Sequence, residues 1–137
     1  FTLEDTQPHE EPVLRSGERV ADAVRTMAAL GAEAVLFNCS MPEVMEAAVR
    51  VARQALGSAS DRVRLGVYAN AFEASHGEMR AANDGLDEIR KDTTPTNYLA
   101  WARQWVDAGA SMVGGCCGIG PEHIAELAAH LQPSAAR

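Results

Sequence analysis

The chain of 137 residues lacks any apolar run that approaches the ~18 residues of a membrane-spanning helix. A signal peptide pattern is also missing. Positive charge is scarce, with 12 Lys and Arg against 19 Asp and Glu and a net charge of −7. Nucleic acids and anionic membranes bind clustered Lys and Arg, so neither is expected as the main partner. This charge balance leaves a small-molecule site open.

Cysteine is equally scarce, with three residues: Cys39, Cys116 and Cys117. A secreted disulfide framework usually has an even number of cysteines in a shorter chain. A disulfide between the neighbours Cys116 and Cys117 would close a strained ring. We therefore expect a reducing compartment, the cytoplasm, and thiols that serve a purpose other than cross-linking.

The apolar residues that are present alternate between two patterns. Short runs rich in Val, Leu and Phe predict buried strands, and stripes of helical period lie between them. Three prolines stand where a first helical turn would begin, at Pro42, Pro95 and Pro121. The predicted strands cover residues 1–3, 34–37, 63–68 and 111–113. This order predicts an α/β fold of four βα units, with a polar insert at 73–94 and a parallel sheet covered by helices on both faces.

Polar and sulfur-bearing residues follow three of the predicted strands. The second strand runs into Asn38 and Cys39, the third into Asn70, and the fourth into Cys116 and Cys117. The carboxyl ends of parallel strands form the edge where α/β folds place their active sites. The three thiols at this edge are the strongest functional signal in the sequence.

Three thiols suit a zinc ion, which prefers thiolate ligands and accepts water or substrate in a fourth position. Residues 116 and 117 would point to opposite faces of a regular strand, so the backbone must leave the extended form there. Glycines at 114, 115 and 118 allow this. Two alternatives stay open: buried cysteines that only fill the core, and a redox cluster without metal. Asn38 and Asn70 are candidates for orienting ligands or substrate, or for capping the strand ends.

Four segments resemble the homocysteine S-methyltransferase family. Gly-Gly-Cys-Cys-Gly-Ile-Gly-Pro-Glu-His-Ile at 114–124 is similar to the zinc motif that closes the family's barrel, and Asn-Cys-Ser-Met-Pro at 38–42 is similar to its earlier Asn-Cys motif. Tyr-Ala-Asn at 68–70 resembles a strand end that usually reads Tyr-Pro-Asn. Trp105 with Ala-Gly-Ala at 108–110 resembles the approach to the last strand. The match runs in the correct order over essentially the whole chain.

The resemblance implies a (βα)8 TIM barrel, of which residues 1–137 are the C-terminal half with about the last four βα units. It implies Zn²⁺ held by Cys39, Cys116 and Cys117, with no further catalytic group. The implied reaction moves a methyl group from S-methylmethionine, S-adenosylmethionine or a betaine-like donor to the thiol of homocysteine, as in methionine biosynthesis. The unusual residues after Asn70 leave the donor open.

A different class of function competes with this enzyme. A half-barrel can bind zinc or a partner without doing chemistry, and this half alone is expected to be inactive if the substrate pocket needs the rest of the barrel. Half a barrel also has open sheet edges. We therefore expect pairing with an N-terminal half or self-association. His123, in the first turn after Pro121, is expected to cap that helix or lie at the surface.

Overall fold

A computed structural model describes residues 1–4, 7–73 and 88–131. Most of the predicted insert, including its expected turn at 83–85, lies outside these residues. The elements follow one another as α1 (Val20–Ala29), β1 (Ala34–Asn38), α2 (Pro42–Leu56), a 3-10 helix η1 (Gly57–Asp61), β2 (Arg64–Tyr68), α3 (Pro95–Ala108), β3 (Met112–Val113) and α4 (Pro121–His130). The predicted prolines begin α2, α3 and α4, where a missing N–H costs no hydrogen bond.

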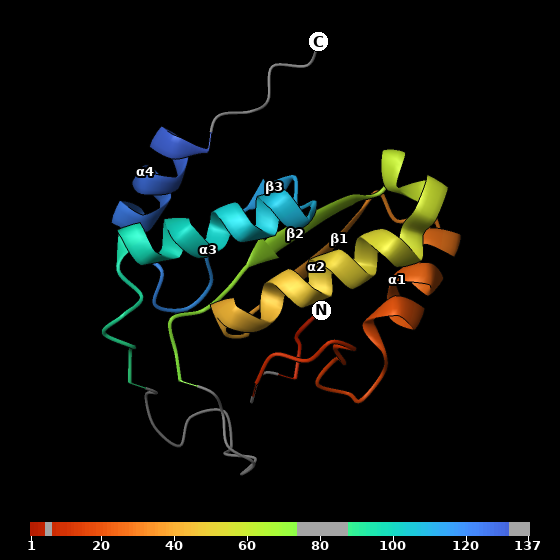
Figure 1. Cartoon of the computed structure of the whole chain (residues 1–137), viewed down its shortest axis with the longest axis horizontal. Helices are drawn as coiled ribbons and strands as arrows, with labels where there is room; N and C mark the ends of the chain where they lie inside the picture. The colour runs from red at the N-terminus through yellow and green to blue at the C-terminus, as the bar shows by residue number, and fades with distance from the viewer. Residues whose placement is uncertain (5–6, 74–87, 132–137) are drawn as a thin grey trace.

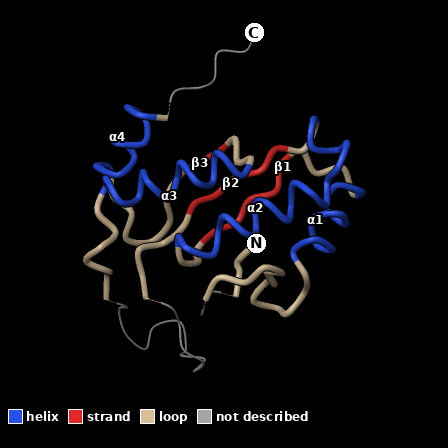
Figure 2. Tube along the Cα trace, viewed as in Figure 1, coloured by secondary structure: helices blue, strands red, loops and turns tan. Residues whose placement is uncertain are grey.

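The three strands form a parallel sheet in which the spatial order equals the chain order, β1-β2-β3. The register pairs Phe37 with Val67, and Val67 with Val113. Right-handed crossovers between strands added in sequence place every connecting helix on the same face. Figures 1 and 2 show α2 and α3 as a layer in front of the sheet. The fold is thus α/β with a parallel sheet, as predicted.

The expected cover on both faces is wrong for the described part of the chain. Along β1, Val35 and Phe37 are buried toward the helices, whereas Leu36 is half-buried on the opposite face. A side chain at Gly66 would meet the side chains of Leu36 and Met112, so all three positions share that second face. The reason is the sequential strand order. Because each right-handed crossover steps in the same direction along the sheet, all connecting helices lie on the first face.

The predicted strand at residues 1–3 is not regular. The amino group of Phe1 donates to the carbonyl of Leu36 at 2.8 Å, and the N–H of Asn38 donates to the carbonyl of Phe1 at 2.8 Å. These are the two bonds of a parallel pair. Leu3 then bonds through its N–H to the Ser40 hydroxyl at 2.9 Å and forms an antiparallel bridge with Leu14. Only the first residue therefore continues the sheet beside β1.

The core lies between the sheet and the helices. Trp105 of α3 is fully buried, its ring meets Tyr98 edge-on at 5.4 Å, and its indole N–H donates to the Pro42 carbonyl at 3.2 Å. This bond fastens α3 to the start of α2, directly behind the end of β1. None of the helices in the described part of the chain combines the length and the apolar content needed to span a bilayer.

Candidate metal centre

The hydrogen bonds of the sheet continue past the last residues of the strands. The N–H of Cys39 donates to the Tyr68 carbonyl at 3.2 Å, and the N–H of Cys116 donates to the Ala69 carbonyl at 2.8 Å. The N–H of Ala71 in turn donates to the Cys117 carbonyl at 2.9 Å. These bonds tie the two cysteine-bearing segments, after β1 and after β3, to the segment after β2 at the predicted edge.

The three sulfur atoms meet there, all within 4.8 Å of one another. The sulfurs of Cys116 and Cys117 are 3.8 Å apart. Zn–S bonds of about 2.3 Å in a tetrahedral arrangement place two sulfurs about 3.8 Å apart, so this spacing fits zinc. Cys39 and Cys116 are half-buried and Cys117 is exposed, which leaves one side of the cluster open to solvent.

Local backbone geometry explains how adjacent cysteines reach one point. Cys39 has φ 51°, in the left-handed region that few non-glycine residues adopt. In the loop after β3, a Cβ at Gly115 would lie 2.3 Å from Ile119, and Gly118 has φ 77°. The chain therefore doubles back tightly over 115–119, and this turn brings the thiols of Cys116 and Cys117 to the same side.

The environment of the cluster resists ionisation of bare thiols. Burial and then a hydrogen bond with Cys39 raise the pKa of the Cys116 thiol above its ordinary value. Several thiolates within 4.8 Å would also repel one another. A divalent cation reverses this balance, because a coordinated thiol loses its proton. Three neighbouring thiolates are thus unfavourable on their own, and binding of a thiophilic metal ion would stabilise them.

The two asparagines make different contacts. The amide oxygen of Asn70 accepts from the N–H of Phe72 at 3.2 Å, which closes a turn after β2, and Asn70 is 6% exposed. Asn38 is half-buried at the end of β1, with its amide oxygen 3.5 Å from the Thr2 hydroxyl. Asn70 thus caps a turn, one of the two predicted roles. A role toward substrate or ligands stays a prediction for both.

Three side chains support the site in ways that the sequence did not predict. His123 caps α4 as expected, but it is buried at 5% exposure. The Tyr98 hydroxyl donates to the Gly114 carbonyl at 2.9 Å, and burial raises the pKa of Tyr98 above its ordinary value. Ser40 is fully buried beside Cys39. Ser40 and His123 lie within the two motifs, but the contacts of Ser40 with Leu3, of Tyr98 with Gly114 and of His123 with Thr93 join distant parts of the chain.

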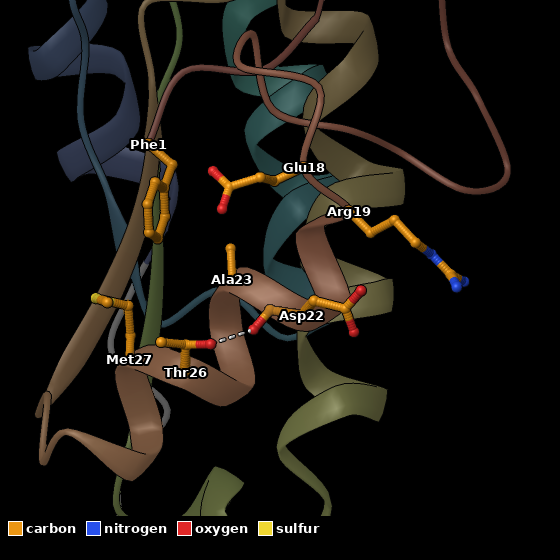
Figure 3. A pocket seen from close by; sticks show the side chains of 7 residues that line it. All are labelled: Phe1, Glu18, Arg19, Asp22, Ala23, Thr26 and Met27. Atoms are coloured by element: carbon orange, nitrogen blue, oxygen red, sulfur yellow. Dashed lines mark hydrogen bonds between the residues drawn. The ribbon is translucent and has the colours of Figure 1, made fainter.

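A separate hollow of about 510 Å³ lies between Phe1 and α1 (Figure 3). The Phe1 ring and Met27 face this hollow, whereas the Arg19 side chain points away from it. Among the described residues, its lining includes no thiol and no residue from the carboxyl ends of β1, β2 or β3. The hollow is therefore distinct from the cysteine cluster.

The geometry agrees with a comparison to known families. The family model for homocysteine S-methyltransferase matches residues 1–131. The chain belongs to the homocysteine S-methyltransferase family. This confirms the resemblance that the four sequence segments carry.

Two members of the homocysteine S-methyltransferase family illustrate the relationship. Homocysteine S-methyltransferase 3 of Arabidopsis thaliana is 31% identical over 120 residues, which cover 86% of this chain and 30% of that protein. Homocysteine S-methyltransferase 2 of Saccharomyces cerevisiae is 27% identical over 135 residues, which cover 90% of this chain and 37% of that protein. The chain thus spans about a third of the length of these relatives.

Proposed function

We propose that this chain carries the zinc centre of a homocysteine S-methyltransferase, with Cys39, Cys116 and Cys117 as the ligands. The reaction would transfer a methyl group to the thiol of homocysteine and form methionine. The observation that carries the proposal is the cluster of three sulfurs within 4.8 Å, in a chain of this family. The 3.8 Å spacing of two of them supports zinc in particular.

The residues of the chain divide the work of this reaction. When bound, zinc supplies a Lewis acid that lowers the pKa of a thiol in its fourth position, so that a sulfur nucleophile exists at neutral pH. The three cysteines would hold the ion, and the exposure of Cys117 leaves the cluster open to a substrate thiol from solvent. Asn38 and Asn70 flank the cluster and are our candidates for contacts with homocysteine. The proposed reaction needs no general base from the protein. The three free thiols are also consistent with a reducing compartment such as the cytoplasm.

The ligand assignment is tested by zinc content after purification under reducing conditions. We expect one equivalent of zinc in the wild-type chain and none in Cys117→Ala. Ser60→Ala, in η1, is the control for a similarly small truncation far from the cluster and should keep its zinc. Retention of one equivalent by Cys117→Ala would refute the ligand set, and a zinc-free wild-type chain would favour a redox or structural thiol cluster.

We further propose that residues 1–137 form the last four βα units of a (βα)8 barrel. Sequential parallel order, helices on one face and the pairing of Phe1 beside β1 support this arrangement. The outer edge of β3 borders an open groove of about 840 Å³ lined by apolar residues such as Val113 and Leu127, which a neighbouring part of the barrel would cover. An N-terminal half or a second copy would complete the sheet.

Methyl transfer is then expected from an extended protein rather than from this chain alone. The assay is methionine formation from homocysteine with S-methylmethionine, S-adenosylmethionine or betaine as the donor. If neither the chain nor its extended form makes methionine with any donor, the enzyme proposal fails. A zinc-loaded chain without activity in either form would instead indicate a half-barrel that only binds zinc or a partner.

A further inference from the structure

His123 lies outside the thiol cluster, in the first turn of α4, directly after the loop that carries Cys116 and Cys117. Its side chain is almost fully buried at the start of α4. The backbone N–H of Gly120 donates to its Nδ1 at 3.1 Å, and its Nε2 lies 2.7 Å from the Thr93 carbonyl. An N–H can only donate and a carbonyl can only accept, so Nε2 carries the proton of a neutral imidazole. Both ring nitrogens are therefore used.

Further hydrogen bonds connect Thr93, the partner of His123 Nε2, to the other end of the loop that carries Cys116 and Cys117. The Thr93 hydroxyl donates to the Arg90 carbonyl at 2.8 Å, and the N–H of Arg90 donates to the Ala71 carbonyl at 2.9 Å. Ala71 then donates to the Cys117 carbonyl. The loop from Cys117 to Gly120 is thus held at both ends by one chain of hydrogen bonds.

The ring of His123 also packs on the residue that holds the beginning of the loop. It meets the Tyr98 ring edge-on at 5.8 Å, and the Tyr98 hydroxyl bonds to Gly114. His123 therefore connects Gly114 and Gly120, on either side of Cys116 and Cys117, through buried contacts. It touches neither thiol in these contacts.

We infer that His123 is a positioning residue for the thiols of Cys116 and Cys117. The inference rests on the proposed zinc function. Zinc affinity depends on ligands held in place, and loss of groups that orient ligands typically costs 10–100-fold in metal affinity. Replacing His123 by alanine frees the Gly120 N–H and the Thr93 carbonyl together, so we expect a loss of zinc affinity in this range although no ligand changes.

The test measures zinc affinity by competition with a chromophoric chelator, and the thiolate-to-metal charge-transfer bands of the cobalt(II)-loaded chain. His123→Asn keeps an acceptor for the Gly120 N–H, and His123→Gln keeps a donor that can reach Thr93. We expect both to bind zinc more tightly than His123→Ala, with cobalt bands closer to those of the wild type. If the alanine variant does not fold, the asparagine and glutamine variants each lack one contact and carry the test.

The control is Val24→Ala, which truncates a fully buried side chain in α1, a helix that packs against α2. It should lower stability but leave zinc affinity and the cobalt bands unchanged. Wild-type affinity and bands in the His123 variants would overturn the inference, as would an equal loss in Val24→Ala. These results differ from failure of the proposed function, in which the wild-type chain itself binds no zinc.

Discussion

Arg90 is a buried cation whose replacement should measurably weaken the fold. Its side chain is 7% exposed and forms ion pairs with two carboxylates, those of Glu43 and Asp92. Nη1 and Nη2 donate to Glu43 at 2.9 and 2.6 Å, and Nε and Nη2 donate to Asp92 at 2.9 and 2.7 Å. The guanidinium also lies over the Trp101 ring at 5.5 Å. These contacts, with Glu43 first, raise the pKa of Arg90, so it stays charged.

The magnitude follows from the exposure of each partner. Glu43 is 30% exposed, so its fork with Arg90 is worth about 2 kcal/mol, at the low end for charge-assisted hydrogen bonds. Asp92 is 56% exposed, and such a pair contributes about 0.5 kcal/mol. The ring contact adds about 0.5 kcal/mol. Arg90→Met keeps the apolar stem and should therefore cost about 3 kcal/mol, or a melting temperature lower by roughly 10 °C in a chain of this size.

The assay is urea denaturation followed by circular dichroism, in a cycle of Arg90→Met, Glu43→Gln and the double variant. We expect a coupling energy of about 1–2 kcal/mol between Arg90 and Glu43. Arg50→Met is the matched control. Arg50 pairs with Glu46 on the exposed face of α2, the helix that also carries Glu43, and loss of this pair should cost about 0.5 kcal/mol or less. If Arg90→Met costs no more than Arg50→Met, the reasoning from burial is refuted.

Two further predictions concern ionisation. The hydrogen bond from Arg90 lowers the pKa of Asp92 below its usual 3.8, so Asp92 stabilises the fold above about pH 4 and loses this contribution as the pH falls through its lowered value. The unfolding free energies of wild type and Asp92→Asn should therefore converge in acid; a constant difference from pH 7 to 2 would contradict this. Without zinc, iodoacetamide should modify exposed Cys117 faster than half-buried Cys116, whose pKa is raised, and added zinc should protect both, as mass spectrometry would show. Equal rates with and without zinc would count against metal binding.

Local patterns in the sequence predicted the parts of the fold that depend on local physics. Apolar periodicity and the prolines at first helical turns placed α2, α3 and α4. The thiol cluster was also predictable, because parallel strands bring their carboxyl ends to one edge whatever their separation in the chain. From the order of the elements alone, Cys39 and Cys116 were predicted to lie at the same edge although 77 positions separate them in the chain.

Long-range contacts explain what the sequence could not reveal. Arg90 lies in the predicted polar insert, and its contact with Glu43, 47 residues away, is not visible in the local sequence. His123 was predicted to cap its helix from its place after Pro121, but its burial depends on Thr93, 30 residues earlier. Leu3 looked like part of a strand, yet its pairing with Leu14 ends the ladder beside β1. In each case the deciding partner lies outside the local window.

The position of the thiols depends on the sheet more than on the rest of a larger protein. Neighbouring strands lie about 4.8 Å apart, and the backbone bonds of Cys39 to Tyr68 and of Cys116 to Ala69 extend this spacing beyond the strand ends. The sulfurs lie within 4.8 Å of one another, and these backbone bonds together with the tight loop after β3 hold the segments that carry them. All of these contacts lie within the described residues of this chain. Zinc binding should therefore persist in the 137-residue chain even where methyl transfer needs further strands, which is why metal content and turnover must be measured separately.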